Sequence, residues 1–270
     1  MTDGRAETPV GRSGPGRGRG RRWPVGALAR GAALAVLMPG LASCDKPQGV
    51  DDDRPAEVRS FPRADRKPAP KGTGDDASEA TRDSAGEART VMALAQIKPG
   101  MTVADIGAGE GYYTVRLSRQ AGKNGRVLAE DIDQSMLEGL GDRVQREQLD
   151  NISIRHGAPE DPRLPASSFD RIFMVHMYHE VKEPYAFLWN VWPALRPGGR
   201  VVIVDRDLPT ARHGMPPALL FCEMGMTGYR LTQFLRKPAV TGYYAEFEAA
   251  GRRPEPSEMR PCREAERSAS

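Results

Sequence analysis

The chain has 270 residues, which suits one α/β domain of roughly 200 residues with appendages. Hydrophobic residues make up 39% of it and charged residues 28%, so a core can form and global disorder is not expected. The net charge of +3 divides into +5 for residues 1–43 and −2 for the remainder. The folded part is therefore mildly acidic, and no nucleic-acid partner is expected, because such binding relies on a basic surface.

Residues 1–43 have the organisation of an export signal, with a Gly/Arg tract followed by an apolar stretch that ends in small residues. Residues 41–44 (LASC) resemble the lipobox of bacterial lipoproteins, in which the cysteine is lipidated and becomes the mature N-terminus. The resemblance implies a lipid anchor in the membrane at Cys44. Asp45 resembles the residue that keeps such lipoproteins on the periplasmic side of the inner membrane. Alternatively, translation starts at Met38, which deletes most of the signal and leaves a cytoplasmic protein.

The other two cysteines, Cys222 and Cys262, make an even number, which suits an oxidising compartment. A disulfide between them and two buried thiols are both open at this stage. No Cys-x-x-Cys pair and no zinc-type spacing of cysteines is present.

Residues 44–76 are rich in Asp, Pro, Lys and Arg, and we expect a flexible polar tether there. The folded domain is expected at 77–250, beginning with a helix-compatible run over 77–97. Residues 251–270 are predicted to form a polar C-terminal tail on the surface.

From residue 101 onward, strand-like and helix-like segments alternate, which predicts an α/β fold with a parallel sheet covered by helices. Strands are expected at 101–106, 126–131, 152–157, 169–176, 200–205, 229–234 and 243–247. Helices are expected at 112–121, 134–147, 184–195 and 217–226. Ligands of such sheets bind beyond the carboxyl ends of the strands.

A glycine-rich loop follows the first of these strands, where Asp105 precedes Gly107, Gly109 and Gly111. The glycines let the backbone turn sharply and approach a ligand closely. Their Gly-x-Gly-x-Gly spacing differs from the Gly-x-Gly-x-x-Gly of dinucleotide folds. The second strand ends at Asp131, about 20 residues on, where a carboxylate can hold a ribose diol. Together the two features predict a nucleoside-containing ligand.

Four segments in this order resemble the class I S-adenosylmethionine-dependent methyltransferases. They are VADIGAGEGYYT (103–114), AEDIDQSML (129–137), HGAPEDPRLPASSFDRIFMVHMYHEV (156–181) and LRPGGRVVIVD (195–205). The resemblance covers about 90–250. It implies a Rossmann-like, doubly wound and mostly parallel seven-stranded sheet with helices on both faces, in which the last strand pair is reversed. It also implies S-adenosylmethionine as the cofactor.

The resemblance extends to individual residues. It implies that the cofactor is bound by Asp105, Gly107, Gly109, Gly111, Tyr112, Asp131, Ala158 and Pro159. Many members have Asp or Asn where this chain has Ala158, so contacts to the adenine edge would rest on backbone, Glu160 or Asp161. Tyr112 and Tyr113 could place a ring near the sulfonium, or could pack the start of the helix.

Histidines are expected near the same edge of the sheet. His176 and His179 are the candidate catalytic residues, because one of them could act as a general base near neutral pH. A metal site formed by His176, His179 and Glu180 is a weaker alternative, and we expect no metal. A purely structural role for the histidines remains open.

The sequence thus predicts an enzyme that transfers a methyl group to a small-molecule acceptor by in-line displacement. The largely apolar stretch 207–229 either walls that acceptor or belongs to the core. One alternative is a non-catalytic S-adenosylmethionine-binding module, which would suit an exported protein that lacks a supply of cofactor. Another is a nicotinamide-dependent dehydrogenase, which would need the longer glycine spacing.

Overall fold

The computed structural model describes residues 52–72 and 78–264, which lie within the unit Asp51–Ser270. The predicted signal segment 1–43 and Cys44 lie outside the described residues. Among the helices of the described ranges, none is both long and apolar enough to cross a membrane.

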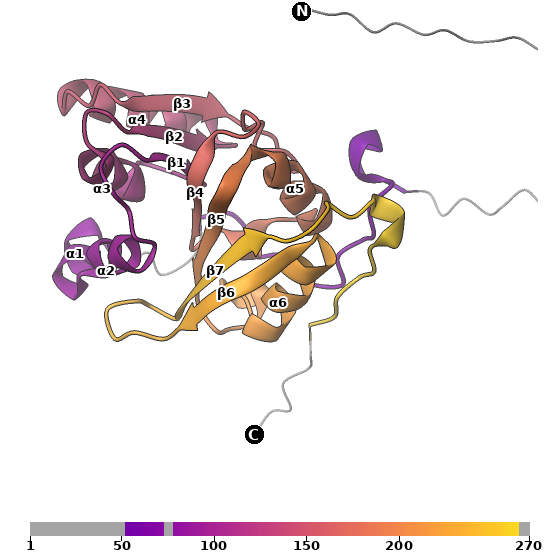
Figure 1. The fold of residues 1–270 in the computed structure, drawn as a ribbon. Helices are drawn as coiled ribbons and strands as arrows, with labels where there is room; N and C mark the ends of the chain where they lie inside the picture. The colour runs from indigo at the N-terminus through magenta and orange to yellow at the C-terminus, as the bar shows by residue number, and fades with distance from the viewer. Residues whose placement is uncertain (1–51, 73–77, 265–270) are drawn as a thin grey trace, which may run out of the picture. The chain divides into compact units, whose positions relative to one another are not determined.

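A seven-stranded sheet forms the centre of the fold, in the order β3-β2-β1-β4-β5-β7-β6 (Figure 1). The strands are β1 (Thr102–Ile106), β2 (Arg126–Asp131), β3 (Ile152–His156), β4 (Phe169–Val175), β5 (Leu195–Asp205), β6 (Tyr229–Leu235) and β7 (Tyr243–Ala249). The first five run parallel, whereas β7 is antiparallel to both β5 and β6. This arrangement confirms the predicted Rossmann-like sheet.

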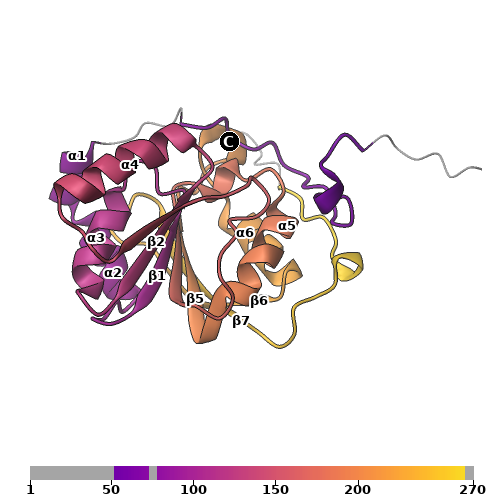
Figure 2. The ribbon, with the colours of Figure 1, turned by 90° about the horizontal axis from the view of Figure 1, so that it is seen from above.

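Helices cover both faces of the sheet. They are α1 (Glu79–Ala85), α2 (Glu87–Leu94), α3 (Tyr112–Ala121), α4 (Gln134–Arg146), α5 (Pro184–Val191) and α6 (Pro217–Met226). Figure 2 shows α1 to α4 on one side of the strands and α5 and α6 on the other. Successive strand residues point to opposite faces, so Val201 packs with α5 and α6 while Val202 packs with α2 and α3.

Burial on both faces explains the apolar runs of the central strands. Residues 201–204 (VVIV) of β5 are fully buried. In contrast, β3 lies at the edge of the sheet and is largely exposed along its length.

The observed elements differ from the predicted ones at three places. The run 77–97 is divided into α1 and α2 by Gly86, which takes a left-handed conformation with φ of 74°. Helix α5 ends at Val191 and continues as a 3-10 turn (Trp192–Ala194), because Pro193 has no N–H for the helical ladder. Strand β5 begins at Leu195 rather than at residue 200, so Pro197, Gly198 and Gly199 lie within the strand.

Residues 52–72, which we name the N-terminal strap, depart from the predicted flexible tether. Val58 and Phe61 are buried in the core cluster around α5 and α6. The guanidinium of Arg66 is fully buried and lies 2.8 Å from the carboxylate of Glu223 in α6. These few side chains anchor a segment that is polar on average. Average composition therefore does not predict that the segment packs against the domain.

The C-terminal residues also pack rather than form a free polar tail, as far as Glu264. Met259 and Cys262 are buried in the same core cluster. Cys262 is joined to Cys222 of α6 by a disulfide with a Cα–Cα distance of 5.9 Å. The pairing that the sequence left open is therefore present.

We expect reduction of this disulfide to destabilise the domain. The bond joins residues 40 positions apart, and cross-links of this kind contribute about 2–4 kcal/mol by restricting the unfolded chain. Thermal unfolding with and without reductant measures the effect, with a Cys222→Ser/Cys262→Ser double variant as the control that reductant should not shift. An unchanged midpoint after complete reduction, verified by thiol counting, would contradict the prediction.

Candidate cofactor and acceptor site

The strand order places the candidate site. Chain order runs outward from β1 to β2 and β3 on one side, and to β4 and β5 on the other. The carboxyl ends of β1 and β4 therefore flank the point where the order reverses, which is where open α/β sheets bind their ligands. The glycine-rich loop follows β1, and His176 and His179 follow β4.

Each glycine of the loop has a positive φ, but only one of them faces open space. A Cβ on Gly107 would lie 2.9 Å from Cγ of Met177, and one on Gly111 would overlap Leu140. A Cβ on Gly109, with φ of 53°, would meet nothing within 4 Å. Gly107 and Gly111 are thus required by packing, whereas Gly109 leaves space that a ligand can occupy.

Asp131 joins the end of β2 to this loop. One carboxylate oxygen accepts from the backbone N–H of Gly109 at 2.9 Å, and the other accepts from that of Asp133 at 2.9 Å. The side chain is 8% exposed. Each oxygen retains a lone pair for a further donor, which is what a ribose diol requires.

Asp105 lies beneath the loop rather than on its surface. Its carboxylate accepts a hydrogen bond from the Thr114 hydroxyl at 2.6 Å, which ties β1 to α3. Burial raises the pKa of Asp105 to about 6. The side chain therefore supports the loop from below, and its predicted contact with the cofactor stays a prediction.

Glu130, which directly precedes Asp131 in β2, is a buried acid. Its Oε1 atom is buried without a hydrogen-bond partner among the described residues. Burial, and next the charge of Asp131, raise the pKa of Glu130 to about 8. Near pH 7 the group is thus largely protonated. An unsatisfied buried polar group is uncommon, and this one lies next to the candidate ribose-binding carboxylate.

Exposed apolar side chains lie beside the same carboxylate. Ile132 follows Asp131 directly and is 37% exposed, and Met136 in the first turn of α4 is 39% exposed. The flat ring of a nucleobase could cover both side chains. The sequence analysis missed this feature, although an isoleucine between two aspartates is a visible signal.

The loop after β3 forms a tight turn closed by two backbone hydrogen bonds. The N–H of Ala158 donates to the carbonyl of Asp161 at 2.8 Å, and the N–H of Asp161 donates back at 3.0 Å. Pro159 has no N–H to offer. The Asp161 carboxylate accepts from the N–H of Arg163 at 2.7 Å. The adenine contacts predicted for Ala158 and Pro159 remain predictions.

Tyr112 is enclosed by the protein's own cations. The guanidinium carbon of Arg82 lies 3.9 Å from its ring centroid and that of Arg116 lies 3.8 Å away. Its hydroxyl donates to Asp83 at 3.0 Å. In this arrangement the ring contacts two guanidinium groups, so a cation–π contact with a sulfonium would have to displace one of them.

His176 faces a buried carboxylate on the helix above it. Its Nε2 atom lies 3.6 Å from Oε1 of Glu87, which also accepts from Arg82 and from the Tyr113 hydroxyl. Burial alone would raise the pKa of Glu87, but hydrogen bonds from His176 and Arg82 outweigh it and lower the pKa to about 2. This geometry favours a positioning role for His176 over a catalytic one.

His179 has a different partner. Its Nδ1 atom lies 3.0 Å from both carboxylate oxygens of Asp205, which is fully buried at the end of β5. A carboxylate only accepts, so Nδ1 carries the proton and Nε2 keeps its lone pair. His179 is therefore the better candidate of the two for removing a proton from an acceptor.

Apolar residues of the segment 207–229 belong mostly to the core. Met215, Leu219, Leu220 and Met224 are at most 2% exposed. They pack beneath the sheet with α5 and do not wall an acceptor pocket. These four residues therefore support the core interpretation of the segment rather than the acceptor wall.

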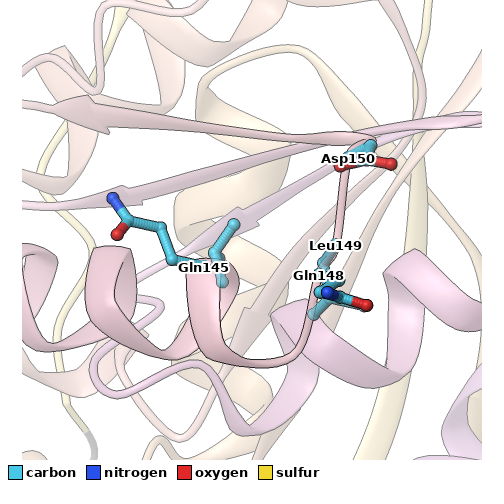
Figure 3. Close-up of a pocket in the computed structure, with 5 residues that line it drawn as sticks. Gln145, Gln148, Leu149 and Asp150 are labelled. Atoms are coloured by element: carbon cyan, nitrogen blue, oxygen red, sulfur yellow. The ribbon is translucent and has the colours of Figure 1, made fainter.

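A surface hollow of about 550 Å³ lies elsewhere, between the end of α4 and the start of β3 (Figure 3). It is lined by Val144, Gln145, Gln148, Leu149 and Asp150. The hollow adjoins the amino end of β3, on the opposite edge of the sheet from the glycine loop, and its lining offers no chemistry for group transfer.

Comparisons with known proteins agree with this geometry. Residues 104–203 match the family model described as a methyltransferase domain. The ubiquinone/menaquinone biosynthesis C-methyltransferase UbiE of Hahella chejuensis is 31% identical over 115 residues, which cover 42% of this chain and 46% of that protein. The demethylmenaquinone methyltransferase of Listeria welshimeri is 24% identical over 121 residues, covering 45% and 51%. The chain spans about half the length of these curated relatives.

Solved structures share the fold. A SAM-dependent methyltransferase from Aquifex aeolicus superposes with a TM-score of 0.54 at 22% identity, covering 64% of this chain and 97% of that one. The [4+2]-cyclase SpnF superposes with a TM-score of 0.51 at 17% identity, covering 64% and 67%. The shared fold and the match of residues 104–203 to the methyltransferase domain model support the predicted methyltransferase domain and its predicted S-adenosylmethionine cofactor.

Replacing Glu130 by glutamine is expected to change how stability depends on pH. The folded state holds the Glu130 proton to about pH 8, whereas an ordinary glutamate releases it near 4.5. The wild type therefore loses stability as the pH rises from about 5 to 9, on the order of 5 kcal/mol, and Glu130→Gln does not. Denaturant unfolding across that range measures the difference.

The matched control is Glu138→Gln on the exposed face of α4, which should follow the wild-type curve. Parallel curves for the wild type and Glu130→Gln would show that Glu130 is ionised in the fold.

Proposed function

We propose that this protein is an S-adenosylmethionine-dependent methyltransferase whose acceptor is a small molecule. The observation that carries the proposal is the contact between Asp131 and Gly109, which places a carboxylate beside the one loop glycine that faces open space. The exposed apolar side chain of Ile132 follows Asp131 directly, and a nucleobase would cover it.

The cofactor, when bound, supplies a methyl group already activated on a sulfonium. The residues of the chain mainly position the reactants. Asp131 and the backbone of the glycine loop would hold the nucleoside. His179, oriented by Asp205, would take a proton from the acceptor at Nε2 where the acceptor carries one.

Quinone-pathway enzymes among the curated relatives support a small organic acceptor. Their identity is low and covers about half of each chain, so the proposal extends to the class of acceptor and not to a particular compound.

Calorimetric titration with S-adenosylmethionine or its demethylated product tests the cofactor site. Asp131→Ala should bind roughly 10- to 100-fold more weakly, because a charge-assisted hydrogen bond is lost. Gly109→Val should abolish binding by filling the open space. Gly198→Val is the control, because Gly198 also has a positive φ with open space around it but lies near the amino end of β5.

A folded wild type that releases no heat would overturn the proposal. Normal affinity of Asp131→Ala would mean that Glu130, or no carboxylate, holds the ribose.

The second candidate is a protein of this fold that binds the cofactor without transferring its methyl group. The neighbour titled a [4+2]-cyclase has the same fold, so the fold does not by itself dictate methyl transfer. Incubation of the protein with methyl-labelled cofactor and pooled metabolites distinguishes the two. Cofactor binding without any labelled product supports the second candidate.

We also propose that the chain is an exported lipoprotein anchored at Cys44. The Cys222–Cys262 disulfide supports this, since disulfides persist mainly in oxidising compartments. Intact-mass analysis of the native protein should give an acylated chain beginning at Cys44. Cys44→Ser should leave an unprocessed or soluble form, with Cys262→Ser as a control that stays in the membrane fraction.

An unacylated mass beginning at Met1 or Met38 would instead place the protein in the cytoplasm. There the cofactor is made, and its supply needs no further explanation.

A further inference from the structure

Three side chains lie close together at the carboxyl edge of the sheet. The proposed methyltransferase function uses only one of them, His179. His179 and Glu180 end the 3-10 turn Tyr178–Glu180, and His213 follows the turn Thr210–Arg212. Each of the three offers one ligand atom, and these atoms lie within 4.8 Å of one another. Segments 30 residues apart in the chain thus place two imidazoles and a carboxylate around one point.

The partner of His179 is an independent observation that points to a metal ion. Histidines that bind a metal usually donate their second ring N–H to a carboxylate, which fixes the tautomer and the ring orientation. Asp205 accepts from Nδ1 of His179 at 3.0 Å and is fully buried. Nε2 is then the nitrogen whose lone pair can ligate.

Further contacts hold the cluster in place. The rings of His179 and His213 meet edge to face with centroids 5.5 Å apart. The backbone N–H of Gly72 in the N-terminal strap donates to Oε1 of Glu180 at 3.4 Å, and the N–H of Ala69 donates to the carbonyl of His179 at 3.2 Å. The strap and the loop after β5 therefore fix the cluster from two sides.

We propose that His179, Glu180 and His213 form a binding site for a divalent transition metal, with Zn²⁺ as the ion that this donor set suits. Two histidines and one glutamate are the protein ligands of several zinc sites that keep a further position for water or substrate. The site includes His179, so with the ion bound Nε2 would no longer be free to take a proton, and the ion itself would take an oxygen of the acceptor or a water molecule.

The proposed site differs from the expectations of the sequence analysis in two respects. A metal was not expected, and the weaker alternative named His176 as a ligand. In the structure His176 lies against Glu87, and His213 takes its place beside His179 because the loop after β5 returns to the end of β4.

Zinc titration of the metal-free, full-length protein tests the site under non-reducing conditions, which keep the disulfide intact. The wild type should bind one equivalent through this cluster, by calorimetry and by elemental analysis after gel filtration. His213→Ala and Glu180→Gln should each weaken binding by more than tenfold. Asp205→Asn should weaken it by about 10- to 100-fold, as loss of a carboxylate behind a ligand does.

The control is His156→Ala, which removes an exposed histidine at the end of β3 outside the cluster and should bind as the wild type does. Circular dichroism of each variant verifies folding. Absence of zinc binding by the wild type, or equal affinity of His213→Ala, would overturn the proposal. The readout does not use S-adenosylmethionine, so failure of this site is distinguishable from failure of the proposed function.

Discussion

The reversal of strand order between β1 and β4 is the constraint on which the site depends. It brings the ends of β1, β2, β4 and β5 to one edge, although their last residues span positions 106 to 205. No covalent bond between these four strands holds their ends at the same edge. The apolar, doubly buried strands do so, because each must lie between two layers of helices to remove its side chains from water. Polar residues that directly follow such strands therefore lie close together at the carboxyl edge of the sheet.

A second layer of organisation comes from buried charges that join elements distant in sequence. Arg66 of the strap and Glu223 of α6 lie wholly out of water, and the Tyr178 hydroxyl donates to the same carboxylate at 2.7 Å. Loss of one partner from such a pair typically costs about 3–5 kcal/mol, because the other charge stays buried alone. On the other face of the sheet, the buried Glu87 carboxylate joins elements in the same way. It accepts hydrogen bonds from Arg82 and Tyr113 and lies 3.6 Å from Nε2 of His176.

The sequence predicted the alternating elements well, since periodicity and turn residues are local signals. It also singled out Asp131 and the glycine loop, which the structure joins through the hydrogen bond from the Gly109 N–H, while their contact with a cofactor stays a prediction. It did not predict that the strap and the C-terminal residues pack, because both are polar on average and attach through single residues such as Arg66 and Cys262. Nor did it pair His179 with Asp205 or His213, because those contacts join segments that only the folded chain brings together.

The docked strap has a consequence for the order in which the protein assembles. Arg66 and its partner Glu223 are 157 residues apart, so a ribosome releases the strap long before α6 exists. The disulfide of Cys222 likewise cannot form until Cys262, 40 residues later, has been added to the chain. A nascent chain stopped before residue 223 lacks β6, β7 and the carboxylate that pairs with the buried Arg66 guanidinium. Completion of the C-terminal third therefore closes both the buried ion pair and the disulfide.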